Sequence, residues 1–190
     1  GGAAVGGIYN AAGATLTVQG AGCAISANLA AGGGGGGGQG GGQAVGGLWS
    51  DGALNITTAC QAAISGNAAG AGRNGTGTGP AASNNDLRGT VSTILGLGVT
   101  VTGGGNVSAV AGPTPFSGAI NVCTNAGGAV CTANYVKTTP AGSVTLTASA
   151  APGQAFAVQW GGACSGTAST CTVTMDQARA VTAAFTWLYP

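Results

Sequence analysis

Short runs of alternating apolar and polar residues, separated by glycine-rich breaks, recur along the first third of the chain. This alternation predicts β-strands, because successive side chains of a strand point to opposite faces. The runs also form an internal repeat: Val5-Gly6-Gly7-Ile8 is answered by Val45-Gly46-Gly47-Leu48, and Leu16 is answered by Leu54. A repeat of this length predicts coils of a parallel β-solenoid, in which each coil covers the apolar face of the next.

Asparagines stand at equivalent breaks of the two repeats, Asn28 in the first and Asn67 in the second. Asparagine tolerates turn conformations and bonds neighbouring backbone groups, so these two residues predict a stacked amide ladder. A third coil is expected within Val91–Val110, and residues 70–88 are expected to form a loop or linker. The strand edges left open at the ends of so short a solenoid favour end-to-end self-association into a polymer.

The strings GGIYN, ATLTV and AISAN of the first repeat, with GGLWS, ALNIT and AISGN of the second, resemble the repeats of polymorphic outer-membrane and autotransporter-type right-handed β-helix proteins. The resemblance extends over residues 5–70. Members of that family usually contain many coils, whereas this chain contains few, so another surface is expected to cover the coil ends.

Longer alternating strands are expected in the last quarter of the chain. They are Ser143–Ser149, Ala155–Trp160, Thr170–Met175 and Ala180–Thr186. The segment 141–186, with its Ala-Pro-Gly and Trp-Gly-Gly-Ala-Cys-Ser-Gly motifs, resembles the divergent InlB-type B-repeat of bacterial surface proteins. That resemblance implies a stalk, spacer or adhesive role, a disulfide between Cys164 and Cys171, and no catalytic residues.

The six cysteines, an even number in a chain without histidine, suit an oxidising compartment. Cys123 and Cys131 flank a glycine-containing break within Phe116–Tyr135, which predicts a hairpin closed by a disulfide. Cys23 and Cys60 then remain as either a staple between coils or an intermolecular bond, and the sequence does not choose between these pairings.

The predicted fold is therefore an all-β chain, with a short parallel β-solenoid of few coils and a small β module, stabilised by disulfides. Three segments are expected: solenoid-like repeats with glycine-rich insertions over residues 1–112, a disulfide hairpin or linker over 113–138, and the B-repeat-like module over 139–190. The chain begins Gly1-Gly2 without a leader pattern, which is consistent with either a processed mature product or a part of a longer protein.

Charge is scarce: 4% of residues are charged, the net charge is +1, and 41 residues are glycine. So little electrostatic repulsion favours self-association, and a homopolymer is the expected partner state. Nucleic-acid binding is not expected, because the four cationic side chains are scattered along the chain. No apolar stretch is long enough to predict a membrane span.

Catalytic chemistry is not expected, because the chain has no histidine and no glutamate, and Asp51, Asp86 and Asp176 lie in different segments. We accordingly expect no metal and no cofactor. The sequence offers three glycosylation sequons, at Asn55, Asn74 and Asn106.

The apolar tail Trp187-Leu188-Tyr189 follows the last expected strand, and it either docks on another subunit or packs within its own chain. Together these features predict a secreted or cell-surface structural subunit that self-assembles into a fibre. The alternative is a fragment of a large adhesin or autotransporter passenger that binds glycans or a host surface.

Overall fold

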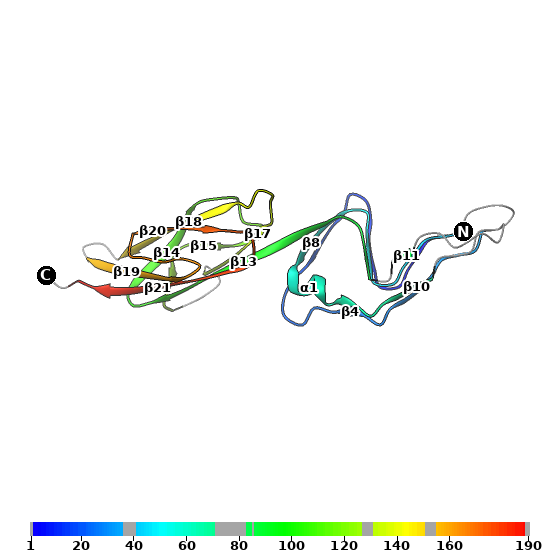
Figure 1. The fold of residues 1–190 in the computed structure, drawn as a ribbon, viewed down its shortest axis with the longest axis horizontal. Coiled ribbons are helices and arrows are strands. Elements are labelled where there is room, and N and C mark those ends of the chain that lie inside the picture. Colours follow the sequence, from blue (N-terminus) through cyan, green and yellow to red (C-terminus); the bar gives the residue numbers. More distant parts are fainter. Residues whose placement is uncertain are drawn as a thin grey trace. The chain divides into compact units, whose positions relative to one another are not determined.

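The computed structural model of the chain describes residues 2–35, 41–70, 83–84, 86–126, 131–150 and 155–188. Nearly every regular element in these residues is a strand, which confirms the predicted all-β class (Figure 1). The chain divides into two compact units, Gly1–Thr93 and Ile94–Pro190. The sequence analysis instead expected boundaries at residues 112 and 138.

The first unit is built from successive sets of very short strands, which we call layers. The first layer contains β1 (Ala4–Val5), β2 (Ile8–Asn10), β3 (Thr15–Val18), β4 (Ile25–Ser26) and β5 (Leu29–Ala31). The second layer contains β6 (Ala44–Val45), β7 (Leu48–Ser50), β8 (Ala53–Thr57), α1 (Thr58–Ala62), β9 (Ile64–Ser65) and β10 (Ala68–Gly70). The third layer contains β11 (Ser83–Asn84) and β12 (Leu87–Arg88).

Every strand of the first layer pairs in parallel with its counterpart in the second layer. The pairing places Leu16 opposite Leu54 and Ile25 opposite Ile64, so the register predicted from the internal repeat is confirmed. The third layer continues the stack, because β11 pairs with β6 and β12 pairs with β7, again in parallel. Stacked apolar side chains form a small core around Leu54.

The paired glycines of each repeat allow the layers to approach closely. A Cβ atom on Gly7 would meet the carbonyl oxygen of Gly47, and one on Gly47 would meet the carbonyl oxygen of Asp86. A side chain at either position would force two layers apart, which explains why glycine recurs there.

The helix α1 was not anticipated by the sequence analysis. Thr57 caps its beginning, since its hydroxyl oxygen accepts a hydrogen bond from the Cys60 backbone nitrogen at 3.4 Å. The stretch Ala59–Ala63 contains no β-branched residue and three alanines, which favours a helix over a strand.

The third coil expected within Val91–Val110 is found there only in part. That segment supplies β13 (Val91–Thr102) and β14 (Gly105–Ala111). β13 pairs with β8 of the second layer, and Val91 packs against the small core of the first unit, so β13 also continues the stack of layers. In addition, β13 pairs antiparallel with one later strand and parallel with another, and the pairings of β14 in the described residues are antiparallel, so most of the segment belongs to extended sheets. The strands β11 and β12 of the third layer lie earlier, within a segment that was expected to be a linker.

The second unit adds β15 (Ser117–Ile120), β16 (Cys123–Thr124), β17 (Cys131–Val136), β18 (Ser143–Ala150), β19 (Phe156–Gly162), β20 (Thr170–Thr174) and β21 (Arg179–Trp187). Its strands follow the orders β15-β17-β13-β21-β19 and β16-β14-β18-β20. Alternate residues of both sets are buried in one hydrophobic core. The last four strands agree with the predicted ones to within two residues at either end.

Candidate binding surfaces

The structure contains three disulfides, all within the chain. Cys23 is bonded to Cys60, Cys123 to Cys131 and Cys164 to Cys171. The first bond joins the loop before β4 to α1, and therefore links the first layer to the second. This is the staple between repeats that the sequence analysis considered beside an intermolecular bond.

The three sequons differ in accessibility. Asn55 lies in β8 and is buried, so its amide is not presented at the surface. Asn106 lies in β14, half-buried, opposite Ser149 in the pairing of β14 with β18. Asn74 falls outside the described residues.

A ladder of polar side chains runs across the three layers. Its members are Asn28 between β4 and β5, Asn67 between β9 and β10, and Asp86 just before β12. Asn28 Nδ2 donates a hydrogen bond to Asn67 Oδ1 at 2.9 Å, which confirms the predicted amide ladder. Asn67 Nδ2 donates in turn to Asp86 Oδ1 at 2.9 Å. The sequence analysis missed Asp86, because the third member of the ladder is not an asparagine and follows at a shorter spacing.

The bonds between the members of this ladder point in one direction, and Asn67 Nδ2 donates in addition to Ile25 O of the first layer at 2.8 Å. The backbone nitrogens donate to the same acceptors as the side chains: Asn28 N donates to Asn67 Oδ1 and Asn67 N donates to Asp86 Oδ1, at 3.1 and 3.0 Å. Asn67 Oδ1 therefore accepts from the layer before it, and Asn67 donates to the Asp86 carboxylate in the layer after it. At the first layer, Asn28 Oδ1 receives no donor within the part of the chain that the structure describes.

Ile8 and Tyr9 of the first layer are much more exposed than their partners in the second. Ile8 is 38% exposed and the paired Leu48 is 0% exposed, while Tyr9 is 55% exposed and the paired Trp49 is 9% exposed. In the described residues β6, β7 and β8 have paired strands on both sides, whereas each strand of the first layer is paired on one side. A hollow of about 350 Å³ lies here, lined by Gly6, Gly7, Ile8, Ala24, Ile25, Ser26 and Asn28.

A column of aromatic and charged side chains follows one edge of the layers. Tyr9 and Trp49 meet edge to face with ring centroids 6.0 Å apart, and the Arg88 guanidinium lies 4.1 Å from the centroid of the Trp49 ring. Such an arrangement combines aromatic and cation–π attraction. Of the Arg88 nitrogens, Nη1 is buried and has no hydrogen-bond partner among the described residues.

Asp51 forms hydrogen bonds with both aromatic side chains of this column. Its two carboxylate oxygens accept hydrogen bonds from Trp49 Nε1 at 2.7 Å and from the Tyr9 hydroxyl at 3.0 Å. These bonds, first the one from Trp49, hold the pKa of Asp51 below its ordinary value. The pKa of Tyr9 is raised, chiefly because its hydroxyl donates to the same carboxylate. Tyr9 and Trp49 occupy equivalent positions of the two repeats, and this match in the sequence could have indicated that their side chains meet.

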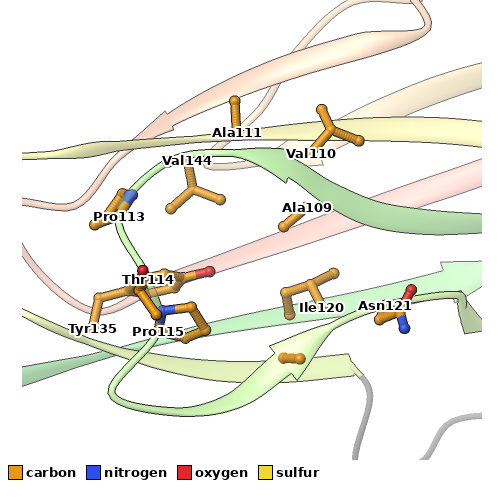
Figure 2. A pocket seen from close by; sticks show the side chains of 12 residues that line it. Ala109, Val110, Ala111, Pro113, Thr114, Pro115, Ile120, Asn121, Tyr135 and Val144 are labelled. Atoms are coloured by element: carbon orange, nitrogen blue, oxygen red, sulfur yellow. The ribbon is translucent and has the colours of Figure 1, made fainter.

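The second unit has an apolar pocket of about 330 Å³ between β14, β15, β17 and β18 (Figure 2). Its walls come mostly from Ala109, Val110, Pro113, Pro115, Ile120 and Val144. Tyr135 is 2% exposed and reaches into the same space, and burial raises the pKa of its phenol. Thr114 and Asn121 supply the other polar lining groups, so the pocket suits a small apolar group with one hydrogen-bonding atom.

The apolar tail packs partly on its own chain. Trp187 ends β21 opposite Phe156, and a Cβ atom on Gly104 would collide with its ring, so the indole lies against the turn between β13 and β14. Leu188 is 55% exposed. Tyr189 falls outside the described residues.

Among the described residues, no helix is long and apolar enough to span a membrane.

Residues 118–187 match the model of the divergent InlB B-repeat domain. The match begins at β15, earlier than the expected start at residue 139. The predicted likeness of residues 5–70 to autotransporter-type repeats has no such support. No curated protein and no solved structure matches the chain.

Proposed function

We propose that this chain is an extracellular, surface-associated adhesive module rather than an enzyme. The observation that carries the proposal is the divergent InlB B-repeat match over residues 118–187. Three intrachain disulfides support an oxidising location, because such bonds persist mainly outside the cytosol. We place the binding function in the first unit, where apolar and polar groups are left uncovered, and a supporting function in the second.

We further propose that the first unit is a short parallel β-solenoid, in which the layers are successive coils. In-register parallel pairing between layers and the hydrogen-bonded ladder across them support this assignment. A solenoid of so few coils needs a covered end to be stable, which favours binding of a further strand-bearing chain.

Localisation tests this proposal most directly. Antibodies raised against the chain should label intact cells of its source, and protease added outside those cells should remove the label. Labelling that appears only after the cells are opened would overturn the extracellular assignment.

A fibre subunit is the second candidate, favoured by the open strand edges of the first layer and by the net charge of +1. Negative-stain electron microscopy of the native protein, with and without reductant, distinguishes the two functions. Regular filaments would support the fibre subunit, while discrete particles would favour the adhesive module.

A further inference from the structure

We propose that the first layer binds an extended segment of another protein as one more parallel layer, and that an asparagine of this segment donates its side-chain amide to Asn28 Oδ1. This inference rests on the adhesive function proposed above and names the chemistry of the partner. The surface comprises the outer edge of β1–β5 and the hollow beside Ile8 and Asn28.

The outer edge of the first layer has unpaired backbone groups. In the described residues, each of β1–β5 pairs with a second-layer strand on one side only. Toward that strand, Asn28 O accepts from Ala68 N at 2.9 Å and Gly32 N donates to Gly70 O at 2.8 Å. Backbone groups of a parallel strand alternate in direction, so the backbone groups of Ala31 point away from the second layer. Such an edge is a template for an added strand.

The side chains at this edge are suited to being covered. Ile8 and Leu29 are 38% and 76% exposed, and Ile25 is half-buried while its partner Ile64 is 6% exposed. An apolar side chain of a segment placed on the first layer would cover Ile25 from its open side. Burial of apolar area supplies the main favourable free energy of such binding.

The polarity of the ladder specifies the partner more closely. Asn28 donates through its backbone nitrogen and one Nδ2 hydrogen to Asn67 Oδ1. Asn67 Nδ2 also donates back to Ile25 O, so the second Nδ2 hydrogen of Asn28 would meet a backbone carbonyl of an added layer, and Asn28 Oδ1 is the acceptor left for a side chain of that layer. The matching group must be a donor. An asparagine in the same register satisfies this requirement, because it would repeat the geometry between Asn28 and Asn67.

A second copy stacked head to tail does not meet the requirement. The corresponding ladder position of its third layer is Asp86, whose carboxylate can only accept hydrogen bonds. Two acceptors would then face each other, Asn28 Oδ1 and the Asp86 carboxylate, which disfavours that contact. The first layer therefore selects a partner other than the third layer of this chain.

Titration of the isotope-labelled full chain with a synthetic peptide tests the proposal by nuclear magnetic resonance. The probe is an acetylated, amidated octapeptide with the sequence of Ala24–Ala31, which carries one asparagine. We expect saturable shifts confined to amides of the first layer, including the side-chain amide of Asn28. No shift up to millimolar peptide, or saturable shifts mainly in the second unit, would overturn the proposal.

Two matched controls separate the ladder from nonspecific binding. A peptide with aspartate in place of its asparagine has no amide donor, and we expect about tenfold weaker binding. The variant Leu29→Lys places a charge at the open edge and should weaken binding severalfold, while Val110→Lys at a 61% exposed position of the second unit should not. Equal affinity of both peptides would remove the donor requirement and overturn the inference.

The result is separable from the test of the proposed function. The titration uses purified protein, so it reports on the edge whatever the location of the chain in its source. Self-association through the same edge would appear as concentration-dependent shifts without peptide, and would contradict selection against a second copy.

Discussion

The two units of this chain are both built from strands but are stabilised differently. The second unit buries a large apolar core between extended strands, with Leu146 0% and Val181 1% exposed. The first unit has a small apolar core and buries polar side chains in hydrogen-bonded columns, including Asn67 at 5% exposed. The comparison teaches that a stack of short strands specifies its register with polar side chains, whereas extended strands specify theirs with long apolar alternation.

The largest expected contrast concerns the disulfides. The bond between Cys23 and Cys60 closes a sequence separation of 37 residues, against 7 for Cys164 and Cys171. In the chain-entropy model these loops correspond to about 4 and about 2 kcal/mol. The double variants to alanine, followed by denaturant unfolding with amide exchange resolved by unit, should show the larger loss in the first unit. Equal losses would show that loop length does not distinguish the units.

Replacing one buried leucine in each core compares how much stability the two cores provide. Leu146→Ala should cost about 4 kcal/mol, because its cavity opens inside the large core. Leu54→Ala in the first unit should cost about 3 kcal/mol, because its neighbour Leu16 is only half-buried and can move into the space. Chemical denaturation of both variants provides the measurement. A greater loss for Leu54→Ala would reverse the proposed ranking of the cores.

The polar ladder is the next target. Asn67→Ala removes the donors to Asp86 Oδ1 and to Ile25 O, so we expect a loss of about 2 kcal/mol in the first unit. Asn134→Ala in the second unit serves as the control, since within the described residues its side chain makes one bond, from Nδ2 to Ser117 Oγ at 3.1 Å. A loss for Asn67→Ala no larger than the control would argue against the ladder as a source of stability.

The smallest expected effect is electrostatic. Asp51 in the first unit and Asp176 in the second both have a lowered pKa, the latter chiefly through its bond with Arg179. A lowered folded pKa means that each contribution to stability is present above the ordinary aspartate value of about 4 and is lost as the pH falls through the folded pKa. Both carboxylates are exposed, so the loss should be slight.

Titration of Tyr9 measures the electrostatic effect of Asp51 in the first unit. Asp51→Asn should lower the pKa of Tyr9 toward its ordinary value, because the carboxylate that accepts a hydrogen bond from its hydroxyl is gone. Ultraviolet absorbance of the phenolate measures the shift. Asp176→Asn should leave Tyr9 unchanged, and a shift in that variant would point to an indirect cause.

Much of the fold was readable from periodicity. The matched positions of Leu16 and Leu54 predicted a real strand pairing, because parallel layers repeat one side-chain pattern. The strands β11 and β12 of the third layer were missed, since they are two residues each and carry too few side chains for a pattern. Asp86 escaped notice because a carboxylate accepts in place of an amide, and only the structure brings it beside Asn67.

The pairing of β13 with β21 has a consequence for mechanical load. These are the first and last strands of the second unit, and they run parallel, from Leu97 opposite Arg179 to Thr102 opposite Ala184. Tension applied through the two ends of that unit pulls the paired strands in opposite directions along their length, so all of their hydrogen bonds resist together. An antiparallel terminal pair would open one bond at a time. Single-molecule pulling should therefore show one abrupt rupture at high force, as suits a tether under flow, and gradual opening at low force would contradict this geometry.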